Sequence, residues 1–244
     1  MSKINVTVWN EYGEEQKEKA VTDIYPQGLH VTISDFLNKD GGINAKTAIF
    51  SDPEHGLTDA VLDNTDVLIW WGHMYHENLD DKIASRVVER VQRGMGIIFL
   101  HSAHKSKPFM RLLGTSGSLS WREAHERNRI WTCTPSHPIA KGIPEQFALE
   151  CEEMYGEPFG IPEPLQTVFI SWFQGGNVFR SGVTFVRENG RIFYFQPGHE
   201  TYPAYHNENV QRIITNAVKW ANPVIKAASL DCPNVQALEK LTDV

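Results

Sequence analysis

A chain of 244 residues with 41% hydrophobic and 22% charged residues has the composition of an ordinary globular protein of one large domain. Its net charge of −7 argues against nucleic acid or an anionic membrane surface as the main partner, and suits a neutral small molecule. The three cysteines lack the spacing of a disulfide or zinc motif. The first residues resemble a strand rather than a signal peptide, and no apolar stretch is long enough to span a bilayer, so we expect a cytoplasmic protein.

The beginning of the chain predicts a β-α-β unit. Residues 4–9 alternate apolar and polar side chains, as a half-buried strand does, and residues 14–24 predict an exposed helix. Residues 28–35 predict a second strand of the same kind. The Gly-, Asp- and Asn-rich residues 38–55 predict a loop.

Two apolar runs follow, at residues 66–71 and 94–100, and such runs are typical of strands covered on both faces. Between them, residues 79–93 repeat apolar side chains at four-residue spacing, which predicts an amphipathic helix. We therefore predict an α/β class, doubly wound fold with a mainly parallel sheet flanked by helices.

After Trp121 the pattern changes to strands without long helices between them. The Asn189-Gly190 pair predicts a hairpin turn, and residues 209–221 predict an amphipathic helix. The fold is therefore expected to carry extra strands in its C-terminal half. The strand-like segments are residues 129–134, 147–152, 166–172, 182–187 and 191–195.

No repeat or linker divides the chain, so we predict a single domain over residues 1–222 and a C-terminal extension over residues 223–244. Val235, Leu238 and Leu241 give the extension a weak helical pattern. It could pack on the body or reach across a subunit interface, and we expect a homo-oligomer.

Histidines follow three of the predicted strands, at the ends where open α/β sheets bind ligands. Imidazole is both a common acid/base catalyst near neutral pH and a frequent metal ligand. His101 and His199 follow their strands most directly, and we expect them to be catalytic, with Glu153 or Glu200 orienting them. Other side chains near these strand ends are expected to bind the substrate: Trp71, His73, His76, Ser102, His104 and Tyr155.

A catalytic zinc ion needs three protein ligands and one open position. The chain has no HxH, HExxH or CxxC spacing, so any metal site would be assembled from distant loops. His101, His199 and Glu153 are the candidate ligands of zinc or another divalent ion. Motifs for a dinucleotide or a nucleoside triphosphate are missing from the sequence.

The turn after residues 96–100 has the outline of a nucleophile elbow, in which a strand runs into a tight turn at the nucleophile. The flanking glycines of that motif are missing, and no cysteine falls at the turn. We therefore expect Ser102 to form a hydrogen bond or to cap a helix rather than to attack a substrate.

Several motifs, in this order along the chain, resemble those of ThuA-like proteins, the trehalose-utilisation family. The resemblance covers residues 4–222 and implies a class I glutamine-amidotransferase-like α/β fold, related to flavodoxin. The motifs are residues 94–103 (GMGIIFLHSA), 137–144 (HPIAKGIP), 153–155 (EMY), 197–200 (PGHE) and 216–221 (NAVKWA).

The same resemblance implies a role in disaccharide breakdown, on a 3-keto-glycoside made by a partner oxidoreductase. His199 and Glu200 match the His and Glu that complete the amidotransferase triad. Position 102 holds serine where amidotransferases hold cysteine, so glutaminase activity is not expected.

The leading hypothesis is a carbohydrate-processing enzyme that acts on a keto-disaccharide, with His101 or His199 as the base. A divalent metal or a backbone amide would hold the developing enolate oxygen. Two alternatives stay open at this point. One is a non-catalytic sugar-binding or assembly protein on the same fold, and the other is a metal-dependent hydrolase of an unrelated substrate.

Overall fold

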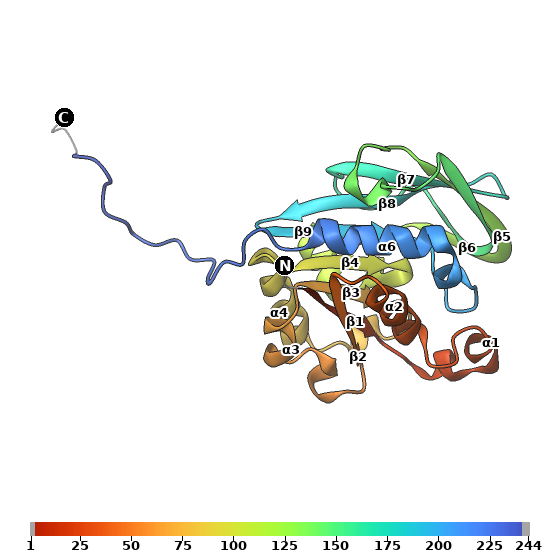
Figure 1. Cartoon of the computed structure of the whole chain (residues 1–244), viewed down its shortest axis with the longest axis horizontal. Coiled ribbons are helices and arrows are strands. Elements are labelled where there is room, and N and C mark those ends of the chain that lie inside the picture. The colour runs from red at the N-terminus through yellow and green to blue at the C-terminus, as the bar shows by residue number, and fades with distance from the viewer. Residues whose placement is uncertain (1–2, 241–244) are drawn as a thin grey trace.

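A computed structural model describes residues 3–240 of the chain, and one mixed sheet runs through it (Figure 1). The described residues form nine strands in the order β2-β1-β3-β4-β9-β8-β7-β5-β6. The first five in this order pair in parallel and the rest pair antiparallel, which confirms the predicted α/β fold with extra strands. The strands are β1 (Ile4–Asn10), β2 (Ile43–Ile49), β3 (Val67–Trp71), β4 (Gly96–Leu100), β5 (Ser120–Thr132), β6 (Gln146–Gly156), β7 (Gln166–Phe173), β8 (Val178–Arg187) and β9 (Gly190–Phe195).

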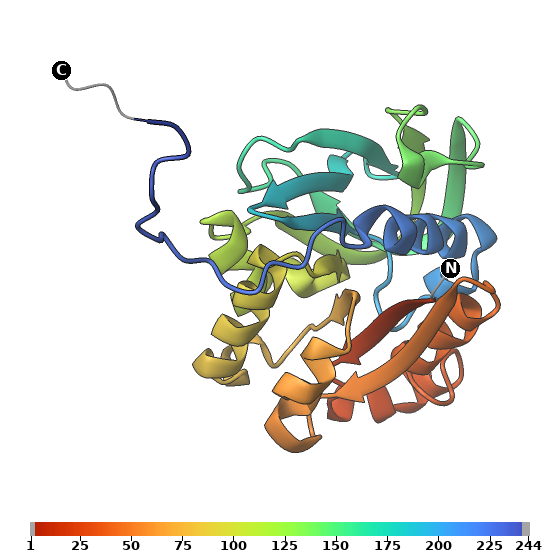
Figure 2. The same ribbon diagram turned by 60° about the vertical axis from the view of Figure 1, so that its left-hand side comes forward.

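Helices cover both faces of the parallel strands (Figures 1 and 2). Helices α2 and α6 bury their apolar sides in one core, and α3, α4 and α5 bury theirs in a second core on the opposite face. The α-helices are α1 (Lys19–Thr22), α2 (Leu29–Asn38), α3 (Asp59–Asp63), α4 (Asp81–Gln92), α5 (Lys107–Leu113) and α6 (Glu208–Ala221). Short 3₁₀ turns occur at Glu14–Lys17, Pro53–Gly56, His76–Asn78, His101–Lys105, Pro138–Ala140 and Ala204–His206.

Two sequence predictions near the start of the chain are wrong. Residues 28–35, predicted as a strand, belong to helix α2, which buries Leu29, Ile33 and Leu37 at four-residue spacing. The β-branched residues of this helix imitate a strand pattern, but burial follows the helical period. Residues 38–55, predicted as a loop, contain β2, an edge strand whose mixed exposure explains its weak apolar signal.

The predicted helix over residues 14–24 is broken into a 3₁₀ turn and the four-residue helix α1. The predicted helices over 79–93 and 209–221 are present as α4 and α6. β5 and β6 are much longer than predicted. The first half of β5 is polar and exposed, and the buried end of β6 begins with two glutamates, so neither gives a continuous apolar pattern. That extra length brings both strands alongside the histidine-bearing strand ends.

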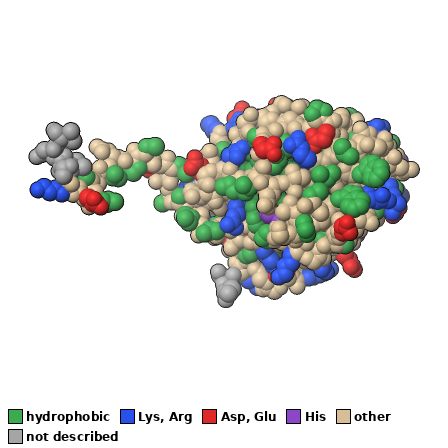
Figure 3. All heavy atoms as spheres, turned by 90° about the horizontal axis from the view of Figure 1, so that it is seen from above, with side chains coloured by type: hydrophobic (Ala, Val, Ile, Leu, Met, Phe, Trp, Pro, Cys, Tyr) green, Lys and Arg blue, Asp and Glu red, His purple; other side chains and the backbone are tan. Residues whose placement is uncertain are grey.

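The C-terminal extension is not helical in its described part. Residues 223–240 contain neither helix nor strand, and Leu241 of the predicted pattern lies outside the described residues. The Ala227 amide donates to the Arg93 carbonyl oxygen at 2.7 Å, and beyond it the segment leaves the body. Figure 3 shows apolar side chains along it, and Leu238 is fully exposed. No helix among residues 3–240 combines the length and apolarity needed to cross a membrane.

Candidate functional site

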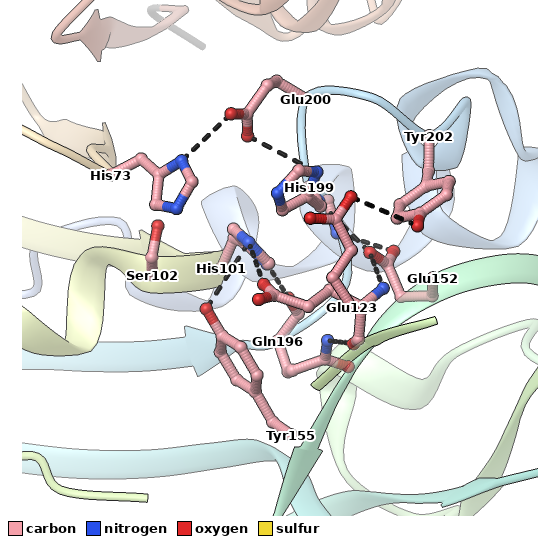
Figure 4. A network of polar contacts seen from close by, with 12 residues as sticks. His73, His101, Ser102, Glu123, Glu152, Tyr155, Gln196, His199, Glu200 and Tyr202 are labelled. Atoms are coloured by element: carbon pink, nitrogen blue, oxygen red, sulfur yellow. Dashed lines mark hydrogen bonds and ion pairs between the residues drawn. The ribbon is translucent and has the colours of Figure 1, made fainter. Parts of the chain in front are cut away.

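The candidate site lies at the carboxyl ends of the parallel strands, beside the end of β6 (Figure 4). His73 follows β3, His101 follows β4 and His199 follows β9, and these three strands are neighbours in the sheet. The ring centroid of His199 is 5.2 Å from that of His101 and 5.3 Å from that of His73. Because carboxyl ends of parallel strands share one edge, the topology brings the three histidines into one cluster.

His101 occupies the strained position of the turn after β4. Its φ of +53° lies in the left-handed region that residues other than glycine rarely adopt. A nucleophile elbow presents its reactive residue on such a turn, and here the strained residue is His101 rather than Ser102. The Ser102 hydroxyl donates to the Gly72 carbonyl oxygen at 2.7 Å. The group that this turn presents is therefore the imidazole.

The His101 imidazole is fully buried, and both of its nitrogens have neighbours. Nδ1 lies 3.0 Å from the Gln196 carbonyl oxygen, which can only accept, so Nδ1 carries a proton. Nε2 lies 3.1 Å from Glu153 Oε2 and 3.4 Å from the Tyr155 hydroxyl. These contacts fix the orientation of the ring and direct Nε2 toward the carboxylate of β6.

Glu200 lies between the two other histidines of the cluster. Its Oε1 is 3.0 Å from His73 Nδ1, and its Oε2 is 3.6 Å from His199 Nδ1. The Thr201 hydroxyl is a second neighbour of His199 Nδ1, at 2.8 Å. Among the described residues, no hydrogen bond reaches Nε2 of His73 or His199. Both rings are therefore held at Nδ1 and can offer Nε2 to a ligand.

Glu152 joins the two sides of the site from a fully buried position. Its carboxylate accepts hydrogen bonds from the backbone amides of Gly198 at 2.9 Å, His199 at 3.2 Å and Glu153 at 3.1 Å. Burial raises the pKa of this carboxyl to about 7. Sequence reasoning did not single Glu152 out, because nothing in the sequence distinguishes it from its neighbour Glu153.

Charge is distributed unevenly over the cluster. Burial alone lowers the pKa of His73, but the Glu200 carboxylate outweighs it and raises that pKa to about 9. Burial also opposes the charge of His101, yet Glu153 holds its pKa above the usual value. At His199, burial and the positive charge of His101 together lower the pKa. The carboxylates therefore favour the cationic forms of His73 and His101, whereas burial favours the neutral form of His199.

The donor set of His101, Glu153 and His199 fits a divalent metal ion. One ligand atom from each of these buried side chains lies within 4.8 Å of the other two. Glu153 Oε2 has no aligned hydrogen-bond partner, although it is buried, so a lone pair is available to an ion. His101 also donates its other ring nitrogen to a backbone carbonyl, as metal-binding histidines commonly do. A second group, His73, His199 and Glu200, meets the same distance limit.

Two residues expected to bind substrate have their polar atoms bonded to the protein backbone. His104 Nδ1 lies 2.6 Å from the Gly117 carbonyl oxygen, and burial lowers the pKa of this imidazole to about 3. The Trp71 indole donates to the Gly198 carbonyl oxygen at 3.0 Å and is fully buried. Both side chains are placed to support the loops of the site rather than to face its interior.

The other expected substrate-binding residues lie closer to the cluster. The Tyr155 ring stacks on His101 at 5.1 Å between centroids, and its hydroxyl approaches Nε2. His76 belongs to the loop after His73 and is partly buried, and burial lowers its pKa to about 4. Of the predicted substrate-binding set, His73 and Tyr155 thus reach the cluster directly, and Ser102 reaches it only through its backbone neighbour His101.

Sequence reasoning missed Glu11 and Glu123. The Glu11 carboxylate accepts from the amides of Met74 at 2.6 Å and Tyr75 at 3.1 Å, and so holds the loop that carries His73. Glu11 directly follows β1, so the strand-end signal that selected the histidines would also have found it. Glu123 lies on β5 and its Oε1 is 3.4 Å from the Tyr202 hydroxyl, and no sequence pattern marks it.

Solved structures with the same fold support this architecture. The chain is similar to a ThuA-like protein from Parabacteroides merdae ATCC 43184, with 15% identity, a TM-score of 0.70 and 93% of each chain covered. A ThuA-like protein from Bacteroides uniformis ATCC 8492 has 15% identity and a TM-score of 0.65, with 90% of this chain and 91% of that chain covered. A cytoplasmic protein from Salmonella typhimurium LT2 has 12% identity and a TM-score of 0.61, with 90% and 100% covered. At these identities the likeness concerns the fold alone.

Sequence comparison identifies the family. No curated protein matches the chain. The model of the ThuA family, described as trehalose utilisation, matches residues 5–221, which span the whole sheet and all six α-helices. This chain therefore belongs to the ThuA family of trehalose-utilisation proteins.

Proposed function

We propose that this protein breaks down a 3-keto-disaccharide or a related keto-glycoside by acid/base chemistry. The observation that carries the proposal is the cluster in which the His199 ring lies 5.2 Å from that of His101 and 5.3 Å from that of His73, beside the carboxylates of Glu153 and Glu200. Burial lowers the pKa of His199, whereas these carboxylates raise the pKa values of His101 and His73. Pairs of titratable groups whose pKa values are driven apart are typical of acid/base sites. Family membership supports a disaccharide as the substrate class.

The proposed reaction needs one base and one acid. A ketone at C3 of the sugar acidifies the proton on C2, and the base removes that proton. The electron pair forms an enolate on the C3 oxygen and then a C1=C2 double bond, as the bond between C1 and the glycosidic oxygen breaks. The acid gives a proton to the departing oxygen, and water can add across the double bond to complete hydrolysis.

His199 is the better candidate for the base. The Thr201 amide donates to Nδ1 at 3.3 Å, and the Thr201 hydroxyl is 2.8 Å from the same nitrogen, so the neutral imidazole carries its proton on Nε2. To act as a base at Nε2, the ring must take the other tautomer, whose Nδ1 proton the Glu200 carboxylate, 3.6 Å away, would stabilise. The lowered pKa keeps this imidazole unprotonated near neutral pH.

His101 and His73 are then the positive groups of the site. Carboxylates raise the pKa values of both imidazoles, which favours the protonated forms that can donate to the glycosidic oxygen or stabilise the enolate. The proton on His101 Nε2 lies near the Tyr155 hydroxyl, which extends the set of donors around the reacting sugar. Glu153 and Glu200 act as positioning residues that orient the imidazoles.

A metal-dependent activity is the second candidate, and the buried Glu153 Oε2 favours it, because this atom contacts His101 Nε2 but has no aligned hydrogen bond. His101, Glu153 and His199 would hold the ion. A bound divalent ion would supply a Lewis acid that polarises a carbonyl oxygen. His73, oriented by Glu200 from 3.0 Å, would then remain as the residue that carries a proton.

The test is turnover of 3-keto-trehalose by the purified protein and its variants. We expect turnover by the native chain and at least about a hundredfold loss in His101→Ala and in His199→Ala, the usual range for removal of an acid/base group. His206→Ala is the matched control, because His206 is an exposed histidine outside the cluster. Far-UV circular dichroism establishes that each variant folds.

Three outcomes distinguish the candidates. Undiminished turnover in both cluster variants would contradict the catalytic roles of His101 and His199. Calorimetric binding of the sugar without turnover would instead favour the non-catalytic alternative. Elemental analysis tests the metal-dependent activity. A stoichiometric ion in the native protein that is lost in Glu153→Ala supports this activity, and active protein without such an ion contradicts it.

A further inference from the structure

The first residues of β5 extend along the open side of the cluster. Trp121 pairs with Tyr155 of β6, and Arg122 pairs with Met154, before the register shifts at Glu126. Directly paired residues of antiparallel strands point to the same face of the sheet. The Trp121 side chain therefore shares its face with Tyr155, whose hydroxyl lies 3.4 Å from His101 Nε2.

A bulge brings two polar residues to the same side. The register shift between Arg122 and Glu126 leaves the intervening residues outside regular pairing, and His125 has a φ of +52°. The Tyr202 hydroxyl lies 3.4 Å from Glu123 Oε1, and the His125 and Tyr202 rings are 5.4 Å apart. Figure 4 shows the Glu123 carboxylate directed toward Tyr202.

Tyr202 connects this bulge to the cluster, since its ring centroid is 5.5 Å from that of His199. Tyr155 and Tyr202 thus link Trp121, Glu123 and His125, which we call the β5 wall, to the two histidines of the proposed reaction. All three side chains are exposed, and Trp121 retains 66% of its accessible surface.

An ion pair between Arg122 and Glu126 stabilises the backbone of the β5 wall. Arg122 Nε donates to Glu126 Oε1 at 2.6 Å, and Glu126 Oε2 accepts from the Gly175 amide at 2.7 Å. Arg122 Nη2 also donates to Asn177 Oδ1 at 3.1 Å. The bulge is therefore anchored to the loop between β7 and β8, although its front is open. A binding surface needs this combination of a fixed backbone and free side chains.

We propose that the β5 wall is the subsite for the second sugar ring, the one that departs, while the histidine cluster holds the keto ring. This inference rests on the proposed function, and it adds where the second ring of the substrate binds. An indole presents a flat apolar face for the C–H groups of a pyranose ring. The Glu123 carboxylate and the His125 imidazole are placed to bond to the hydroxyl groups at its edge.

A charged pocket alone would not distinguish a disaccharide from a simple glycoside. The cluster offers hydrogen bonds and charge to the reacting ring, but the Tyr155 and Tyr202 rings that contact its histidines are buried. Trp121, opposite Tyr155 on β5, offers an exposed aromatic face. The wall therefore accounts for how a family of disaccharide utilisation would select a two-ring substrate.

The experiment compares KM for 3-keto-trehalose with KM for methyl 3-keto-α-glucoside, which lacks the second ring. We expect Trp121→Ala to raise the ratio of KM for 3-keto-trehalose to KM for the methyl glucoside about tenfold, because the variant loses about one stacking contact with the second ring. Trp172→Ala is the matched control, because Trp172 is 48% exposed on β7 and packs on Arg129 instead. Glu123→Gln should raise the same ratio to a smaller extent.

An unchanged KM ratio in Trp121→Ala, with normal turnover, would overturn the subsite and leave the proposed function intact. If the native protein turns over neither compound, the proposed function fails, and calorimetric binding of trehalose then decides on the subsite. Binding that weakens in Trp121→Ala but not in Trp172→Ala supports it. The subsite would be overturned if both variants bind trehalose equally or if the native protein does not bind it. A change of oligomeric state without a change in sugar binding would also overturn the subsite.

Discussion

The parallel and antiparallel halves of the sheet contribute to the site in different ways. The parallel half places His73, His101 and His199 at the carboxyl ends of adjacent strands, so their positions follow from the topology. The antiparallel half, in which Ser120–Phe195 contains no α-helix, contributes Glu152 and Glu153 from within a long strand. One half is regular and supplies imidazoles, whereas the other is irregular and supplies carboxylates and the β5 wall.

This difference implies that the antiparallel half decides whether the parallel half is correctly assembled. The Glu152 carboxylate on β6 accepts hydrogen bonds from backbone amides in the loop after β9, and the Glu153 carboxylate lies beside His101. The histidines would leave their strands at the same edge without these carboxylates, but their charges and ring orientations would differ. Three changes to the sequence test that division of roles.

Glu152→Ala is expected to have the largest effect. It removes the acceptor of the buried amides of Gly198, His199 and Glu153 and should lower the free energy of unfolding by at least about 3 kcal/mol. Urea denaturation measures this loss. Glu150→Ala is the control, since Glu150 is an exposed glutamate on the same strand. Equal stabilities of the two variants would contradict a role for Glu152 in joining the halves.

The second test separates the backbone of His101 from its imidazole. Because its φ is +53°, His101→Gly should be about 1 kcal/mol more stable than His101→Ala, while both lack the imidazole. At His104, in the same 3₁₀ turn but without a positive φ, the order should reverse, since glycine is there the less favourable residue. Thermal unfolding of the four variants measures both differences. The same order at both positions would refute strain at His101.

The third test concerns His30, a histidine of helix α2 outside the site. Asn10 donates to His30 Nδ1 at 3.2 Å, and burial lowers the pKa of this imidazole to about 4. The native state therefore binds fewer protons than the unfolded chain between that value and the usual 6.5, so stability declines as the pH falls through this range.

His30→Gln should flatten that decline by at most about 1.4 kcal/mol per pH unit, without changing the trend above pH 7. Urea denaturation of both proteins at pH 7 and pH 5 measures it. A parallel pH dependence in the variant and the native chain would show that His30 does not titrate on unfolding.

Within the parallel half, the sequence predicts the central strands better than the elements near its edge. Residues 66–71 and 96–100 are buried on both faces, so their apolar runs predict β3 and β4 and the histidines after them. The helix α2 was predicted as a strand, because Val31 and Thr32 favour strands locally and only packing reveals the helical period. The edge strand β2 was overlooked since half of its side chains face solvent.

The positions of the carboxylates in the site could be predicted only in part from the sequence. Glu153 was predicted beside His101 from its motif, but the equivalent importance of Glu152 depends on which way each side chain points from β6. Glu123 depends on a bulge in β5, and a bulge has no reliable signal in one sequence. Such positions are set by strand register, which is a property of the assembled sheet.

The hydrogen bond between His101 and Gln196 has a consequence for how the chain acquires its activity. These residues are 95 positions apart, and the loop that carries His199 follows Gln196 directly. During synthesis, β1, β3 and β4 are complete long before β9 leaves the ribosome to pair with β4. Contacts of such long sequence separation form late, because loop closure must precede them. The nascent chain therefore carries His101 without its partners, and the cluster is completed only when nearly the whole domain has been made.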